Sequence, residues 1–144
     1  MTGVQTCALP ILAPENFALE QWLEKMIAQN QGPDLALELH NDGNGFLHWS
    51  RPPNPDASRY PQRMQTLENL LRRHTWFTEG SSKDGANVGT LADGWLERYG
   101  VDAAVHEFNC QWAAGLGRTP LGRDWEKYGE GLARVFEEYF AAGE

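Results

Sequence analysis

Cysteine is scarce in this sequence: 144 residues hold Cys7 and Cys110 only, and neither belongs to a CxxC pair. Two cysteines cannot form a disulfide framework, and the missing CxxC pair argues against a thiolate zinc site. Positive charge is also sparse, with 12 Lys and Arg against 20 Asp and Glu and a net charge of -8. Nucleic acids and anionic membranes both require a basic patch, so neither is an expected partner. No apolar run approaches the roughly 20 residues of a membrane span, and we expect a soluble protein.

The sequence does contain the composition of one globular domain. Hydrophobic residues make up 41% of it, including 6 Trp, 6 Phe and 4 Tyr. A chain of 144 residues suffices for one ordinary domain but not for two. The composition leaves the oligomeric state open.

The first eleven residues, MTGVQTCALPI, differ from the rest. They carry no charge, no helical or strand periodicity, and no positive region of the kind that begins a signal peptide. They resemble a translated sequencing adapter, a contaminant of assembled metagenomic reading frames; the alternative is a short natural strand or a truncated leader. We therefore expect residues 1–11 to be a non-native leader, and residues 12–144 to be the C-terminal part of a larger catalytic domain whose N-terminal part is missing.

Residues 12–144 alternate between helical and strand patterns. The helical segments run from Pro14 to Gly32, Ser58 to His74, Leu91 to Gly100 and Arg123 to Ala142, and the strands are Asp34–His40, Phe46–Ser50 and Val101–Asn109. Thr75–Thr78 is β-prone, Asn41–Gly45 is a turn, and Glu79–Val88 reads as a surface loop. The alternation predicts an α/β fold in which helices flank a mixed sheet.

Two predicted strands end in polar residues, which is where an α/β sheet places its functional side chains. His40 ends the first, where it either binds a metal or holds the turn that follows. In the later strand, alternation places Glu107 on one face with Ala103 and Val105, and His106 on the other. A carboxylate among apolar neighbours suits a general base, whereas an ion pair with an arginine or plain exposure is the alternative.

The order of these segments, DLALELHNDGNG followed later by GTLADGWLERYGVDAAVHEFN, resembles the C-terminal half of the zinc carboxypeptidase family. The resemblance implies the carboxypeptidase-like fold and hydrolysis of C-terminal peptide bonds, with Zn²⁺ as cofactor and a peptide or amide as substrate. It makes His40 the third zinc ligand and Glu107, 67 residues later (107 − 40), the residue that activates water. Tyr99 becomes the candidate for the tyrosine that closes over substrate, although its setting also fits a tyrosine packed at a helix end. A secreted or periplasmic location would suit the family.

Two features of the family are missing from the sequence. It contains no His-x-x-Glu motif, which would supply the other two zinc ligands, and no arginine precedes His40 to bind the substrate carboxylate. A catalytic zinc requires three protein ligands. We therefore expect this chain to be inactive, to bind zinc weakly, and to aggregate or oligomerise through an exposed strand edge.

Two other functions remain open at this stage. One is a catalytically dead, carboxypeptidase-like binding module that keeps the fold without the reaction. The other is a hydrolase that uses two carboxylates, Glu38 and Glu107, as glycosidases do. His48 either lines the site or belongs to a surface strand, and the tryptophans and the C-terminal aromatic residues are expected to be core.

Overall fold

The computed structural model describes residues 14–54, 58–83 and 90–142. Its elements, in chain order, are α1 (Pro14–Ala28), β1 (Leu35–Asp42), β2 (Phe46–Trp49), α2 (Tyr60–His74), β3 (Ser81–Ser82), α3 (Leu91–Tyr99), β4 (Asp102–Asn109) and α4 (Gly122–Ala141). The segment assigned to a non-native leader, residues 1–11, lies outside the described residues. Among the helices described, none is both long and apolar enough to cross a membrane.

The four strands form one mixed sheet in the order β1-β4-β2-β3. β4 runs parallel to β1 and antiparallel to β2, and β2 pairs in parallel with the two-residue β3. β4 is therefore an interior strand with a partner along each edge, whereas β1 forms one edge of the sheet. The mixed α/β sheet predicted from the sequence is confirmed.

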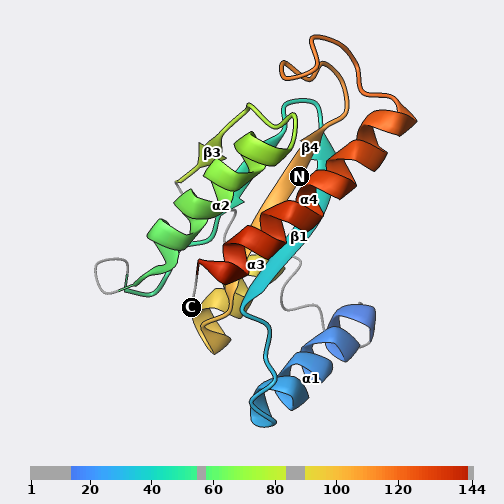
Figure 1. Ribbon diagram of the computed structural model, residues 1–144. Coiled ribbons are helices and arrows are strands. Elements are labelled where there is room, and N and C mark those ends of the chain that lie inside the picture. The colour runs from blue at the N-terminus through green and yellow to red at the C-terminus, as the bar shows by residue number, and fades with distance from the viewer. Residues whose placement is uncertain (1–13, 55–57, 84–89, 143–144) are drawn as a thin grey trace.

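Helices α2 and α4 cover one face of the sheet, in front of the strands in Figure 1. The core on this side joins Leu47 and Ala104 from the strands to apolar side chains of both helices. α4 contributes the aromatic residues that its helical spacing predicted, including the buried Tyr128 and Tyr139. The expectation that the C-terminal aromatic residues form core is confirmed for Tyr128 and Tyr139 but is wrong for Phe140, which is 45% exposed. Trp112, which is 64% exposed, also departs from the expectation that the tryptophans are core.

The opposite face carries a smaller core. Ala103 and Val105 of β4 pack there with Leu23 of α1 and Trp95 of α3. Glu20 of α1 binds Arg98 of α3 through two hydrogen bonds of 2.6 and 2.7 Å, which joins the two helices. Faces of β4 thus alternate as the sequence predicted, with odd-numbered residues toward α1 and α3 and even-numbered residues toward α2 and α4.

The segment Thr75–Thr78, expected to be β-prone, forms no strand. The Thr75 hydroxyl donates to the carbonyl of Leu71 and accepts from the amide of Phe77, so the segment instead ends α2. The strand in this region is β3, which lies within the predicted loop Glu79–Val88. Its Ser81 hydroxyl donates to Glu68 of α2 at 2.6 Å. A tertiary contact, rather than β propensity, fixes its position.

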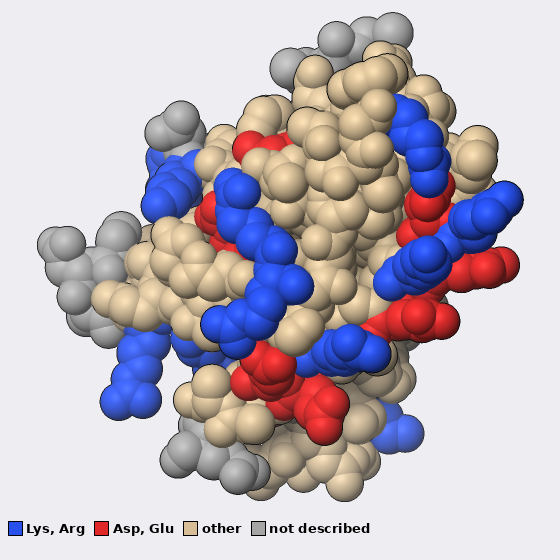
Figure 2. Space-filling view, turned by 45° about the horizontal axis from the view of Figure 1, so that its top comes forward, with Lys and Arg blue, Asp and Glu red and all other residues tan. Residues whose placement is uncertain are grey.

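Charges of both signs lie next to one another on the face shown in Figure 2. Several of them are paired between or within helices: Glu138 of α4 contacts both Arg73 and His74 of α2, at 3.0 and 2.8 Å. Arg72 pairs with Glu68 one turn away. The basic residues that are scattered in the sequence thus form local ion pairs on these helices.

Candidate functional site

His40 and Glu107 lie side by side at the carboxyl ends of two neighbouring parallel strands. The β1–β4 ladder pairs Glu38 with Val105 and His40 with Glu107. Directly paired residues of adjacent strands project from the same face of a sheet. The two side chains named by the sequence therefore share one face and one end of the sheet, although 67 residues (107 − 40) separate them in the chain.

The turn after β1 fits tightly against the end of β4. The Asp42 side chain accepts hydrogen bonds from the amides of Asn44 and Gly45, at 2.8 and 2.6 Å. Gly45 has φ 72°, and a Cβ atom there would lie 2.8 Å from the backbone nitrogen of Asn109. Only glycine combines that backbone conformation with so close an approach. The glycine of the HNDGNG turn thus allows the turn to rest on β4, two residues beyond Glu107.

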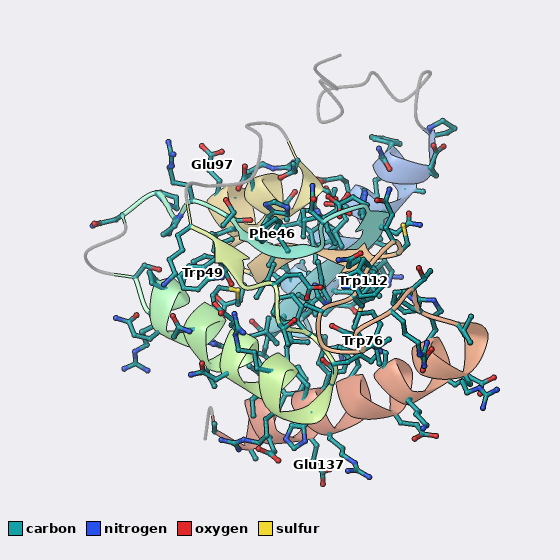
Figure 3. All side chains as sticks on the ribbon, turned by 90° about the horizontal axis from the view of Figure 1, so that it is seen from above. Phe46, Trp49, Trp76, Glu97, Trp112 and Glu137 are labelled. Carbon is teal, nitrogen blue, oxygen red and sulfur yellow. The ribbon has the colours of Figure 1, made fainter. Side chains whose placement is uncertain are left out.

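Asn109 connects three loops at this end of the sheet. Its amide nitrogen donates to the carbonyls of Asn44 and Trp112, at 3.1 and 2.7 Å, and to Glu79 at 3.3 Å. Trp112 is 64% exposed and lies on the loop that leaves β4; Figure 3 views this end of the molecule. From the sequence, Asn109 is expected to follow the base Glu107 at the end of a strand and to help shape the pocket. The signal available in the sequence was an asparagine at the end of a strand and before a loop. Its three hydrogen-bond acceptors come from separate parts of the chain, so the sequence could not predict these contacts.

The carboxylates around His40 are only partly satisfied. His40 Nε2 lies 3.0 Å from Oε1 of Glu38, with side-chain exposures of 47% and 27%. Oε2 of Glu38 and Oε2 of Glu107 are both buried, and neither has a hydrogen-bond partner within the described residues. Leaving a buried polar atom unpaired costs about 1–3 kcal/mol. Both oxygens lie on the face of the sheet that carries His40.

The other two candidate histidines lie on opposite faces of the sheet. His48 sits opposite Val105 in the β2–β4 ladder, half-buried on the face of Glu107. It therefore belongs to an interior strand rather than the surface strand that the sequence favoured. His106 is fully buried on the other face, with its Nε2 2.7 Å from the hydroxyl of Tyr128. Its predicted position, away from Glu107 and in the core, is confirmed.

Tyr99 is not brought together with His40 and Glu107. It is the last residue of α3 and precedes the amino end of β4, whereas Glu107 lies near the carboxyl end. Its hydroxyl donates to Glu24 at 3.0 Å and lies 3.2 Å from Glu20, both on α1. Burial of the hydroxyl, together with these contacts, raises the pKa of Tyr99 to about 12. The geometry favours the reading in which Tyr99 packs at a helix end.

The described residues do not by themselves form a zinc site. A search of the described part of the chain finds no group of three or more His, Cys, Asp or Glu side chains that could hold a metal ion. His40 is one exposed nitrogen donor, and its Nε2 is already in contact with Glu38. A catalytic zinc needs three protein ligands and an open position. The donor set here falls short of that requirement.

Comparison with known proteins identifies the fold. No protein-family profile matches the sequence, and no curated protein sequence matches it. Among solved structures, a metallo-carboxypeptidase from Burkholderia cenocepacia matches with a TM-score of 0.78 at 11% identity, over 96% of this chain and 37% of that one. A metallo-carboxypeptidase from Pseudomonas aeruginosa, in complex with (2-guanidinoethylmercapto)succinic acid, matches with a TM-score of 0.53 at 19% identity, over 83% of this chain and 36% of that one. The chain thus has the fold of a little over a third of these metallo-carboxypeptidases.

Proposed function

We propose that this chain carries part of the active site of a zinc-dependent hydrolase that cleaves C-terminal peptide bonds. In this proposal Glu107 is the general base and His40 is one metal ligand. The observation that carries it is the parallel pairing of His40 with Glu107 on one face, at the carboxyl ends of β1 and β4. Open α/β sheets bind their ligands at this position.

Glu107 has the properties of a proton-transfer residue. Its side chain is half-buried, and its Oε2 atom is buried without a partner in the described structure. In the proposed reaction this carboxylate takes a proton from an attacking water and returns it to the leaving amine. The adjacent His40 is more exposed than Glu107. Such exposure suits a ring nitrogen that binds a metal ion together with residues other than those described.

The likeness of the fold to solved metallo-carboxypeptidases is what suggests the reaction class in this proposal. This chain spans 37% and 36% of the two neighbours. Because His40 is a single donor, the remaining ligands have to come from residues other than those described. A peptide or amide substrate is part of the proposal, and the P. aeruginosa neighbour was solved with a small carboxylate-bearing ligand. Tyr99 as a substrate-closing residue and a secreted or periplasmic location remain predictions from the sequence.

The decisive experiment starts from the source DNA upstream of Leu12. If the reading frame continues and encodes a His-x-x-Glu motif and an arginine, the extended protein should contain one zinc and release C-terminal residues from peptides. Glu107→Gln should then lower kcat by about 10²–10⁴-fold while zinc content stays unchanged. Glu97→Gln is the matched control, because Glu97 lies on the exposed outer side of α3 (Figure 3). Full activity of the Glu107 variant would refute the assignment.

A second candidate function is a carboxypeptidase-like binding module without catalysis. The observation in its favour is that the described residues supply no three-ligand metal group. Its test is the same upstream sequence: a continuing frame that lacks both the His-x-x-Glu motif and the arginine would support the binding module over the hydrolase.

A further inference from the structure

One carboxylate of the site has no role in the proposed reaction. Glu38 precedes His40 by two residues on β1 and therefore projects from the same face of the sheet. Its nearest partner in the ladder is Val105, and the preceding pair on this face is Ala36 with Ala103. An apolar side chain would suit such a position better than a charged one. The presence of a carboxylate there calls for a polar partner.

That partner is His40. Oε1 of Glu38 lies 3.0 Å from Nε2 of His40, within hydrogen-bond distance, while Oε2 is buried and has no partner among the described residues. In the part of the chain that the structure describes, no hydrogen bond reaches Nδ1 of His40. A neutral imidazole has one N–H and one lone pair, and the group that accepts from the N–H decides which nitrogen keeps the lone pair.

We propose that Glu38 is a positioning residue for His40. It accepts a hydrogen bond from Nε2–H, holds the ring against β1, and leaves Nδ1 as the nitrogen that offers its lone pair to the site. This contact reproduces a general arrangement in which a carboxylate orients a ligand histidine through its other ring nitrogen. The inference rests on the proposed function only for the identity of the group that Nδ1 contacts. The ring orientation itself is a property of this chain.

Histidine-selective ¹⁵N labelling tests the proposal without metal or substrate. The chain has only four histidines, so their ring signals remain few enough to assign even in an oligomer. The spectra are recorded at a pH at which the ring signals have stopped changing with pH, so that the ¹⁵N shifts report the tautomer. We expect His40 to be almost entirely in the Nε2–H form. In Glu38→Ala it should shift toward the mixture that an unpartnered imidazole populates.

Two further variants separate positioning from a general effect of charge. Glu38→Gln keeps an acceptor oxygen and should preserve the Nε2–H form of His40. Glu107→Gln removes the neighbouring charge on β4 and should leave the His40 tautomer unchanged. The buried His106 signal reports in each variant that the fold is intact.

The outcome is decisive in either direction. An unchanged His40 tautomer in Glu38→Ala, with the His106 signal in place, would overturn the positioning role. An equal change in Glu107→Gln would overturn it as well, because it would show that charge near the ring, rather than the Glu38 contact, sets the tautomer. Since neither zinc nor hydrolysis enters the measurement, failure of the proposed enzyme activity would leave the result standing.

Discussion

Nε2 of His106 lies 2.7 Å from the hydroxyl oxygen of Tyr128, and both side chains are buried between β4 and α4. Phe77 and Phe108 pack edge-on against the imidazole, with ring centroids 5.2 and 4.8 Å away. Burial in this aromatic environment lowers the pKa of His106 to about 4, although a backbone hydrogen bond with Phe46 opposes the shift. The folded protein therefore keeps His106 neutral at every pH above about 4.

This pKa predicts a loss of stability in mild acid. In the unfolded chain His106 binds a proton below about pH 6.5, whereas in the folded chain it does so only below about 4. The contribution of neutral His106 to the free energy of unfolding is thus fully present above pH 6.5. It falls by about 3 kcal/mol as the pH drops toward 4. Urea unfolding across this range should show a smaller pH dependence for His106→Gln than for the parent. Equal dependence in both would contradict the assignment.

Two glycines of α4 should respond in opposite directions to the same substitution. A Cβ on Gly131 would meet the carbonyl oxygen of His74 and lie 2.9 Å from Cγ2 of Thr75, so α2 and α4 would have to separate. We expect Gly131→Ala to lower the free energy of unfolding by about 1–3 kcal/mol. Gly129 is exposed on the same helix with open space around it, and Gly129→Ala should raise the free energy by about 0.5–1 kcal/mol. Chemical denaturation measures both, and a loss of stability in the Gly129 variant would argue against this account.

The free edge of β1 should make the isolated chain self-associate. β1 is an eight-residue edge strand without proline or lysine, and Leu39 on it is 52% exposed. Such an edge is a template for pairing with another strand. Leu39→Lys should therefore reduce association in sedimentation velocity, because a lysine on an edge strand disfavours pairing. Trp112→Lys is the control: it removes more exposed apolar surface from a loop and should leave association unchanged.

A parent chain that sediments as a monodisperse monomer and melts cooperatively would contradict the edge prediction. It would also weaken the expectation that residues 12–144 belong to a larger sheet, since such a sheet would leave β1 in need of a neighbour.

The purified chain should bind zinc only weakly. His40 is a single donor, and no three-ligand group exists among the described residues. In a competition titration against a chromophoric chelator, zinc should stay with the chelator, and His40→Ala should change the curve little. A tight site of one zinc per chain that disappears in His40→Ala would show that the missing ligands lie within the 144 residues after all.

Local pattern was enough to predict the elements that matter most. The apolar run of β1, the alternation of β4 and the aromatic spacing of α4 each appear within a short window of sequence, and the structure has all three. Hydrophobic burial on one face produces the patterns of β4 and α4. The apolar run of β1 was expected to be a buried strand, whereas β1 is an edge strand with no fully buried residue. Because the side-chain period of a strand is two, assigning Glu107 to one face and His106 to the other required no knowledge of the neighbouring strands.

Features that depend on distant parts of the chain could not be predicted in the same way. The two serines of β3 have no β propensity, and their place is set by a hydrogen bond from Ser81 to Glu68. Trp22 fits the apolar face of α1 but is half-exposed, because α1 meets the rest of the protein mainly through Leu23 and Glu20. The pairing of His40 with Glu107 is likewise a matter of register between strands, which alternation alone cannot specify.

The place of β4 in the sheet determines the order in which the protein can assemble. β1 and β2 are joined by the short turn that begins at Gly43, yet they are not neighbours, since β4 lies between them. With strands spaced about 4.7–4.9 Å apart, the two stand about twice that distance from each other in the folded sheet. On the ribosome, β1, β2, α2 and α3 all emerge before β4. We expect the entry of β4 to complete the core with α1 and α3 and to bring Glu107 beside His40, while the core with α2 still awaits α4.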